Sequence, residues 1–174
     1  MEIRLLLPTD VRTEFRSGDP DLDRFFARFA GQNQFRLHVG TTYVAVEAGR
    51  VLGYATVAAG QMEGESVQGA VRRKLPRYPL PVLRLARLAV DETARDKGLG
   101  KALLRYVLTL ATRMSQEFGC IGVLVDAKPH AIAFYARYGF EALDLIVGGA
   151  ESRPAPQPMF LPLALIEQAL HPGK

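Results

Sequence analysis

The fold is decided by residues 87–101, which read RLAVDETARDKGLGK. This stretch begins at the end of an apolar segment, residues 82–90, whose alternating side chains predict a β-strand. After the two glycines, apolar side chains recur at i, i+4 and i+7 spacing as far as Gly119, which predicts a glycine-rich turn followed by a long helix. A strand, turn and helix in this order bring free backbone N–H groups to the positive end of a helix. We therefore expect an anion site at residues 95–101.

Two common phosphate-binding patterns do not match this turn. The dinucleotide pattern G-x-G-x-x-G requires a third glycine at position 103, where the chain has Leu103. The P-loop pattern requires a glycine at position 95 and a hydroxyl at position 102, where the chain has Arg95 and Ala102. The sequence therefore gives no support for a dinucleotide-binding or P-loop protein.

The residues before the turn predict a helix and a hairpin. Ser17-Gly18-Asp19-Pro20 is typical of a helix start, and the apolar residues after it have helical spacing to about Gly31 or Gln34. Residues 41–46 and 51–59 are rich in Val, Thr and Tyr, and they predict two strands of a β-hairpin. Residues 60–81 contain three glycines and three prolines, and they predict a long loop with room for a short helix.

The residues after the long helix predict a second strand and helix. Residues 121–125 predict a short strand, residues 129–138 a helix closed by Gly139, and residues 148–158 a turn-rich connection. Residues 159–163 and 164–170 predict a last strand and helix. The β-α-β-α order predicts one α/β (α+β) domain over residues 1–174.

Composition excludes several classes of protein. The 174 residues are 48% hydrophobic and 23% charged, which is typical of a globular chain and argues against disordered, collagen-like and disulfide-stapled proteins. Cys120 is the only cysteine, so an internal disulfide and a multi-thiolate metal site are excluded. No signal-like N-terminal core is present, and apolar runs end well before the ~18 residues of a membrane span. We expect a cytoplasmic protein without a bound metal.

The charge is unevenly distributed along the chain. The net charge is +4, but residues 72–113 carry +8 and the remainder −4. Such asymmetry favours an anionic ligand or a nucleic acid, and the alternative is a solvated basic face with no ligand.

Three motifs together carry a family resemblance. They are Arg87-Leu88-Ala89-Val90-Asp91, Arg95-x-x-Gly98-x-Gly100 and Ala133-Phe134-Tyr135-x-x-x-Gly139-Phe140. In this combination and order they resemble the GNAT superfamily of acetyl-CoA-dependent N-acetyltransferases. The resemblance implies the GNAT fold, a mixed and twisted central sheet with a splayed strand pair flanked by helices. It also implies acetyl-CoA as the co-substrate.

The same resemblance implies the residues that hold the cofactor. Backbone N–H groups of the turn hold the CoA pyrophosphate, and the edge of the preceding strand pairs with pantetheine and polarises the thioester carbonyl. The implied cofactor-binding residues are Leu88, Ala89, Val90, Arg95, Asp96, Lys97, Gly98, Leu99, Gly100 and Lys101. Tyr135 matches the family tyrosine that protonates the departing thiolate. The chain departs from many relatives at Lys128-Pro129-His130, where those relatives carry an asparagine.

The acceptor amine follows from charge and from a narrower resemblance. An α-amine with a pKa of about 7.7–8.0 is closer to its neutral, reactive form than a lysine of pKa ~10.4. The strand at residues 82–90 presents Arg84 and Arg87 but no carboxylate, which favours an anionic acceptor over a polycation. Thr42-Tyr43-Val44, Val51-Leu52-Gly53-Tyr54 and Arg87-Leu88-Ala89-Val90-Asp91 resemble the GNAT toxins of type II toxin-antitoxin modules.

That narrower resemblance implies acetylation of aminoacyl-tRNA, a homodimer and a ribbon-helix-helix antitoxin. The implied substrate-binding residues are Arg87, Arg72, Arg73, Lys74, Arg77 and Asn33. Two alternatives remain open: a GNAT enzyme of a protein N-terminus, a lysine or a small amine, and a CoA sensor without catalysis.

Overall fold

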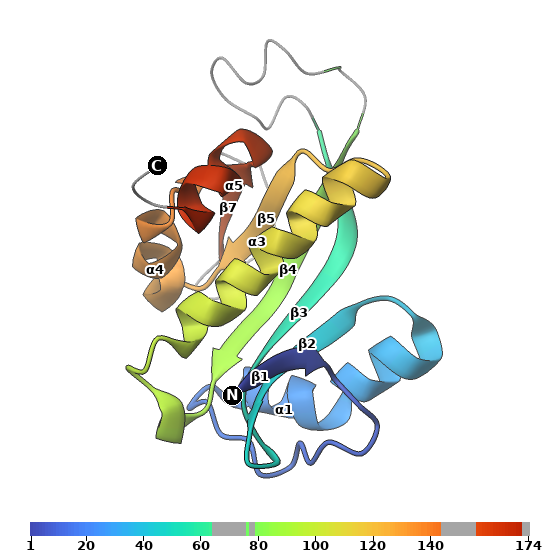
Figure 1. The fold of residues 1–174 in the computed structure, drawn as a ribbon, viewed down its shortest axis with the longest axis vertical. Coiled ribbons are helices and arrows are strands. Elements are labelled where there is room, and N and C mark those ends of the chain that lie inside the picture. The colour runs from blue at the N-terminus through green and yellow to red at the C-terminus, as the bar shows by residue number, and fades with distance from the viewer. Residues whose placement is uncertain (64–75, 77–78, 144–155, 172–174) are drawn as a thin grey trace. The chain divides into compact units, whose positions relative to one another are not determined.

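The structure is a computed structural model that describes residues 1–63, 76, 79–143 and 156–171. Seven strands form one sheet in the order β1-β2-β3-β4-β5-β7-β6 (Figure 1). The strands are β1 (Glu2–Leu5), β2 (Thr41–Glu47), β3 (Arg50–Met62), β4 (Leu80–Val90), β5 (Gly122–Ala127), β6 (Glu141–Ala142) and β7 (Gln157–Pro162). The helices are α1 (Pro20–Arg28), α3 (Leu99–Glu117), α4 (Ile132–Arg137) and α5 (Leu163–Leu170), with the shorter η1 (Gln32–Leu37), η3 (Glu92–Ala94) and η4 (Pro129–Ala131).

The sheet is mixed. The pairs β1–β2, β2–β3, β5–β7 and β6–β7 are antiparallel. Strands β4 and β5, which are joined by α3, run in the same direction (Figure 1). The predicted α/β class with a mixed sheet flanked by helices is therefore confirmed.

The chain divides into two compact units, each described by itself below. The first unit is Met1–Ala58 with Leu85–Thr109, and the second is Ala59–Arg84 with Leu110–Lys174. Strands β3 and β4 and helix α3 pass from one unit into the other. The single domain over residues 1–174 and the splay of β4 from β5 stay predictions.

The first unit is built around an aromatic core under α1. Asp19 caps this helix by accepting hydrogen bonds from the N–H groups of Asp21 and Leu22, and Pro20 occupies the first turn, as predicted. The ring of Phe26 stacks on that of Tyr54, with centroids 4.5 Å apart. The buried residues of this core are Leu6, Phe15, Phe25, Phe26, Ala30, Val44, Val51, Tyr54 and Ala89.

The second unit is built on β5 and β7. These strands pair in one continuous register, from Gly122 opposite Pro162 to Ala127 opposite Gln157. The N–H of Ile121 donates to the Pro81 carbonyl at 2.9 Å, which connects the start of β4 to the residue before β5. A small buried cluster of Met62, Val82, Leu143 and Phe160 packs within this unit.

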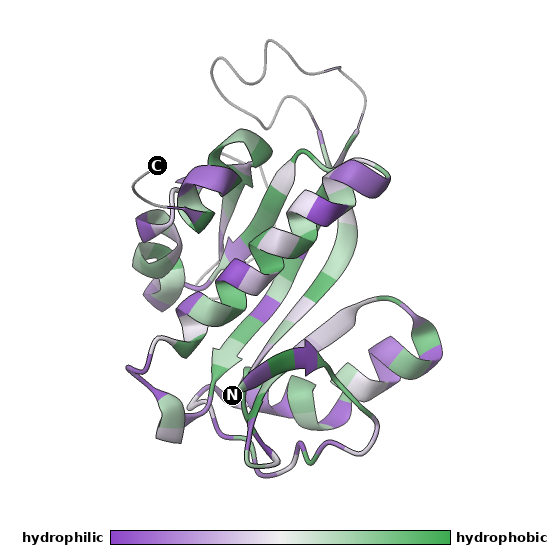
Figure 2. Cartoon of the chain, in the orientation of Figure 1, coloured by the Kyte–Doolittle hydropathy of each residue, from purple (hydrophilic) through white to green (hydrophobic). Residues whose placement is uncertain are grey.

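The strand-turn-helix prediction is confirmed. Strand β4 covers the predicted strand, and α3 begins within the predicted turn and ends two residues before Gly119. Helix α3 is drawn in Figure 2 as alternating green and purple segments, as expected for a helix with one apolar and one polar face. The hairpin, the strand after α3, and the last strand and helix are also confirmed to within a few residues.

Other predictions were wrong in extent. The predicted loop of residues 60–81 is narrower, because β3 continues to Met62 and β4 begins at Leu80. Residues 64–75 and 77–78 of that loop lie outside the described part of the chain, and so do residues 148–155 of the predicted connection. The predicted helix of residues 129–138 is split into the 3₁₀ turn η4 and the short α4. Strands β1 and β6 and the π-helix η1 were not predicted.

Candidate functional site

The turn before α3 has the backbone shape of an anion site. Asp96 and Gly98 adopt left-handed conformations with φ of 61° and 77°, and a Cβ at Gly98 would meet nothing within 4 Å. Within the described residues, the N–H groups of Leu99, Gly100 and Lys101 have no hydrogen-bond acceptor, because they form the first turn of a helix. The first N–H that bonds back into the turn belongs to Ala102, which donates to the Gly98 carbonyl at 3.1 Å. The arrangement offers three donors at a positive helix end.

The start of α3 is anchored directly on the sheet. A Cβ at Gly53 of β3 would lie 2.9 Å from Leu103 Cδ1 and 3.2 Å from both Leu99 Cδ2 and the Ala89 carbonyl oxygen. A residue larger than glycine would force the buried Leu103 side chain to shift. The free N–H groups therefore start from a helix turn whose position over β3 is fixed by packing.

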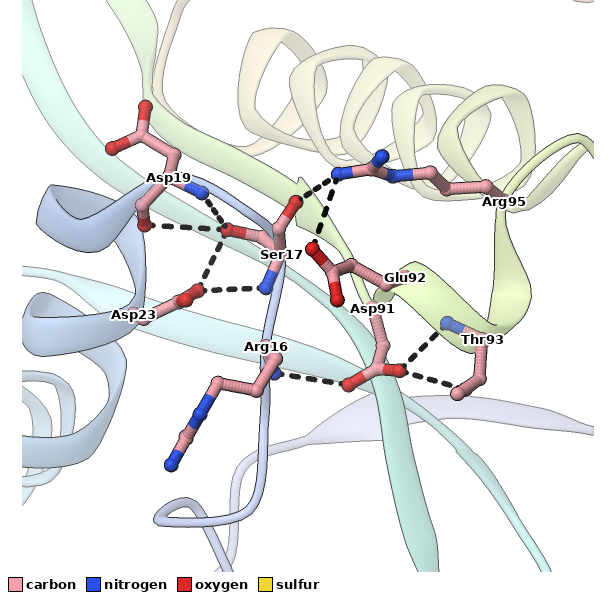
Figure 3. A network of polar contacts seen from close by, with 8 residues as sticks. All are labelled: Arg16, Ser17, Asp19, Asp23, Asp91, Glu92, Thr93 and Arg95. Carbon is pink, nitrogen blue, oxygen red and sulfur yellow. Dashed lines mark hydrogen bonds and ion pairs between the residues drawn. The ribbon is translucent and has the colours of Figure 1, made fainter.

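A buried carboxylate holds the chain just before the turn. Asp91 is 1% exposed, and it accepts hydrogen bonds from the backbone N–H groups of Arg16 and Thr93, both at 3.0 Å, and from the Thr93 hydroxyl at 2.7 Å (Figure 3). Arg50 lies 3.5 Å from the same carboxylate. Burial alone would raise the Asp91 pKa, but these donors outweigh it and lower the pKa below its ordinary value. Asp91 is therefore ionised at neutral pH.

The side chain of Arg95 contacts the segment before α1 and the neighbouring Glu92. Its guanidinium donates to the Ser17 carbonyl and lies 3.9 Å from the Glu92 carboxylate (Figure 3). Sequence reasoning placed Arg95 in the anion turn and did not anticipate this contact, which joins residues 78 positions apart. The neighbouring Asp96 and Lys97 are exposed.

The end of β4 leads into this turn. Ala89 is buried, while Leu88 and Val90 are half-buried. The N–H of Asp91 donates to the Leu52 carbonyl at 2.8 Å, which joins the end of β4 to β3.

The two arginines of β4 have different environments. The guanidinium of Arg87 lies over the ring of Phe25, and within the described residues it makes no ion pair. Arg84 instead pairs with Asp126 of β5 at 2.9 Å. Strand β4 itself carries no carboxylate, as its sequence shows, but the neighbouring strand supplies one to Arg84.

The other predicted substrate residues are only partly described. Asn33 is half-buried in η1, where its carbonyl accepts from the N–H of Val39 at 3.1 Å. Next to it, Gln34 bridges two segments, donating to the Leu6 carbonyl at 3.1 Å and accepting from the Thr42 N–H at 2.8 Å. The basic loop residues Arg72, Arg73, Lys74 and Arg77 lie outside the described residues.

Tyr135 lies in α4 of the second unit and is 5% exposed. Its ring contacts those of Phe134 and Phe140 edge-on, with centroids 5.1 and 5.4 Å apart. Burial raises the pKa of its phenol above the ordinary value, and the hydroxyl makes no hydrogen bond to the described residues. Tyr135 is therefore a protonated donor at neutral pH. Tyr138 contacts Phe134 at 5.3 Å.

The described residues contain neither a cluster of metal-ligating side chains nor a long apolar helix. No group of three His, Cys, Asp or Glu side chains in the described part is placed to hold a metal ion. None of the helices described has the length and apolar character that crossing a membrane requires.

Comparison with known proteins identifies the family. The family model described as the acetyltransferase (GNAT) domain matches residues 38–142. The chain belongs to the GNAT acetyltransferase family. The matched span includes the β2–β3 hairpin, β4, the turn before α3, and Tyr135. This GNAT acetyltransferase is also 35% identical to the tRNA-acetylating toxin of Mycobacterium tuberculosis over 142 residues, which are 79% of this chain and 82% of that toxin.

Solved structures share its fold. A bacterial toxin superposes with a TM-score of 0.84 at 25% identity, covering 99% of this GNAT chain and 97% of the toxin. AtaT complexed with acetyl-methionyl-tRNAfMet superposes with a TM-score of 0.81 at 24% identity, over 95% and 96% of the two chains. A tyrosine-to-phenylalanine mutant of AtaT, bound to the C-terminus of the antitoxin AtaR and to acetyl-CoA, has a TM-score of 0.74 at 22% identity over 98% of each chain.

Proposed function

We propose that this GNAT acetyltransferase transfers the acetyl group of acetyl-CoA to the α-amine of the aminoacyl group on charged tRNA, and so blocks translation. The observation that carries the proposal is the 35% identity to a tRNA-acetylating toxin, over about four-fifths of both chains. The motifs quoted from the sequence, which resemble the GNAT toxins, support the same assignment.

Acetyl-CoA supplies an activated acetyl group and an anionic diphosphate. The residues present fit such a donor, because Leu99, Gly100 and Lys101 offer N–H groups that have no acceptor among the described residues, next to the open space at Gly98. We assign the diphosphate to backbone N–H groups of residues 95–101, namely Arg95, Asp96, Lys97, Gly98, Leu99, Gly100 and Lys101. The pantetheine arm is assigned to the strand edge at Leu88, Ala89 and Val90, where a backbone N–H polarises the thioester carbonyl.

Tyr135 is assigned the role of general acid. Its buried phenol stays protonated at neutral pH, and its hydroxyl has no partner among the described residues that would compete for the proton. Tyr135 would donate this proton to the CoA sulfur as the C–S bond breaks, and the proton that the amine nitrogen loses on forming the C–N bond would return to the phenolate or pass to water. No described carboxylate or histidine is assigned as base, because an α-amine of pKa about 7.7–8.0 is in part neutral at pH 7.

The acceptor side is assigned to positive charge. Arg87 contributes a half-buried guanidinium that has no carboxylate partner within the described residues. Asn33 and the basic loop of Arg72, Arg73, Lys74 and Arg77 are assigned to the tRNA, the loop to its phosphates. Such contacts hold the backbone in a salt-dependent way and carry little sequence information.

The proposal extends to the partners and the compartment. We propose a homodimer that acts in the cytoplasm and is neutralised by a ribbon-helix-helix antitoxin. The fold shared with AtaT, which has been solved with its antitoxin AtaR, supports the toxin-antitoxin assignment.

The acceptor assay is the direct test. Purified protein is incubated with labelled acetyl-CoA and bulk charged tRNA, in parallel with peptides, polyamines and the same tRNA after deacylation. We expect label on charged tRNA that is released with the amino acid on mild base treatment, and none on deacylated tRNA. Label recovered only on peptides or polyamines would replace the toxin function with that of another GNAT enzyme, and no transfer at all would leave a CoA-binding protein.

A further inference from the structure

The turn at residues 95–98 has few contacts of its own that would stabilise its conformation. Residues 95–98 are all exposed, and two of the four, Asp96 and Gly98, are left-handed. An exposed turn of this kind has few local contacts, so other parts of the fold must hold it in one conformation. Downstream, Leu99 packs against β3 at Gly53. The upstream end needs a separate support.

That support comes from the segment just before α1. The Arg16 N–H donates to the Asp91 carboxylate at 3.0 Å, and the Arg16 carbonyl accepts from the Glu92 N–H at 2.8 Å. One residue further on, the Ser17 carbonyl accepts from the Arg95 guanidinium (Figure 3). We call Arg16, Ser17, Asp91 and Arg95 the latch. It joins residues 75 and 78 positions apart in the sequence.

The segment that contains Arg16 and Ser17 is itself hydrogen-bonded to the start of α1. The Ser17 hydroxyl donates to the Asp23 carboxylate at 2.6 Å, and the Ser17 N–H donates to the same carboxylate at 2.9 Å. The Asp19 N–H in turn donates to the Ser17 hydroxyl at 3.1 Å. The latch therefore rests on the capped first turn of α1, which packs its aromatic face into the core.

We propose that the latch positions the turn for the diphosphate of the acyl donor, with Asp91 and Arg95 as positioning residues that act through the backbone of residues 95–101. This inference rests on the proposed function, in which that turn holds acetyl-CoA. Asp91 holds the end of β4 through its hydrogen bond from Arg16. Arg95 holds the start of the turn through the hydrogen bond that its side chain donates to the Ser17 carbonyl.

The sign of a charge effect separates positioning from direct electrostatics. Removing the Asp91 carboxylate beside an anion site would by charge alone strengthen the binding of a diphosphate. A positioning role predicts weaker binding of the diphosphate. The N–H groups of Arg16 and Thr93 donate to different oxygens of Asp91, and an asparagine has only one oxygen and an N–H₂ group that cannot accept. Asp91→Asn is therefore the informative variant, and Thr93→Val tests the same support without any change of charge.

The experiment compares two acyl donors that differ in the diphosphate. The values of kcat/KM are measured with acetyl-CoA and with acetylpantetheine, which lacks the diphosphate and the nucleotide, using the amine that the wild type acetylates fastest. The variants are Asp91→Asn, Thr93→Val and Arg95→Ala. The matched controls are Asp126→Asn, which removes the exposed partner of Arg84, and Arg113→Ala, which removes an exposed arginine of α3 that lies 3.7 Å from Glu117.

We expect kcat/KM for acetyl-CoA to fall on the order of ten- to a hundredfold in Asp91→Asn and Arg95→Ala, through a raised KM, while acetylpantetheine is used as well as by the wild type. Thr93→Val is expected to show a smaller loss with the same selectivity, and the controls none. Equal losses with both donors would show a general structural role and overturn the proposal, as would tighter acetyl-CoA binding by Asp91→Asn. A wild type that binds no CoA in calorimetry would instead overturn the proposed function.

Discussion

The guanidinium carbon of Arg87 lies 3.7 Å from the ring centroid of Phe25. Strand β4 thus presents Arg87, which makes no ion pair with the described residues, on an aromatic surface provided by α1. Phe25 is itself buried, and its ring stacks at 6.3 Å on that of Tyr54, whose hydroxyl donates to the Leu22 carbonyl at 2.7 Å. The orientation of the proposed substrate arginine therefore depends on the packing of α1.

We predict that Phe25→Leu weakens the use of charged tRNA without weakening that of acetyl-CoA. Leucine keeps the site apolar but removes a cation–π contact worth about 0.5–2 kcal/mol, so the KM for charged tRNA should rise about 2- to 30-fold. The matched control is Phe29→Leu, because Phe29 ends the same helix and is 46% exposed. A KM for charged tRNA that equals the wild-type value would exclude this role for the ring.

We predict that Tyr135→Phe lowers kcat on the order of 10²- to 10⁴-fold, because it removes the general acid and keeps the ring that packs on Phe134 and Phe140. The midpoint temperature of thermal unfolding of Tyr135→Phe should stay close to that of the wild type. Tyr138→Phe, three residues further on, is the matched control and should retain wild-type kcat. Growth arrest on expression should disappear in the first variant only, and toxicity that persists in Tyr135→Phe would contradict the assignment.

The pH dependence of catalysis gives a separate test of Tyr135. Burial raises the pKa of the phenol above its ordinary value of 10.0, so the protonated form that donates persists to higher pH than in an exposed tyrosine. We expect that kcat does not fall on the alkaline side until above pH 10, within the range in which the protein stays folded. A decline centred near the ~8.5 of an ordinary thiol would assign the essential acid to another group.

We predict that Gly53→Ala destabilises the first unit by about 1–3 kcal/mol, because its Cβ would lie 2.9 Å from Leu103 Cδ1. The buried Leu103 side chain must then shift within the first turns of α3, so the KM for acetyl-CoA should rise as well. Gly40→Ala is the control, since its Cβ would lie 3.3 Å from the Val57 carbonyl oxygen in the same unit and would meet no atom of α3 or of the turn within 4 Å. Urea unfolding measures the loss of stability. A Gly53→Ala variant with the wild-type stability and the wild-type KM for acetyl-CoA would refute both predictions.

We predict an acid-sensitive contribution from the Arg4–Asp10 pair. Two guanidinium nitrogens of Arg4 donate to the two oxygens of Asp10 at 2.9 and 2.8 Å, and with the Leu7 N–H they lower the Asp10 pKa below 3.8. A lowered pKa stabilises the fold above pH 3.8, and this stabilisation is lost as the pH falls through the folded value. Asp10→Asn should therefore cost about 1–3 kcal/mol at pH 7 and progressively less near pH 3.

The control for this pair is Asp21→Asn. Asp21 pairs with Arg24 at 2.7 Å, but both side chains are exposed, so the loss should be under about 1 kcal/mol. A stability difference between the wild type and Asp10→Asn that does not change between pH 7 and pH 3 would show that the ionised pair is not its source.

The elements that sequence reasoning recovered are those defined by neighbouring residues. The glycine-rich turn, the apolar spacing of α3 and the capping of α1 by Asp19 all depend on residues within a few positions, and the structure contains all three. The elements it missed depend on distant partners. Strand β1 carries two charged residues in four and is a strand because β2 pairs with it, and β6 is a two-residue strand on β7.

For the site, the amino-acid sequence by itself determined which motifs are present and the family that they indicate, because those signals are local and ordered along the chain. Only the tertiary structure decided how the side chains are used. It paired Arg84 with Asp126, placed Arg87 over Phe25, and bound Arg95 to the Ser17 carbonyl. These contacts join residues that are 42 to 78 positions apart. The free energy of such a contact depends on which surfaces the fold brings together. The spacing of residues along the chain does not indicate which distant residues will meet.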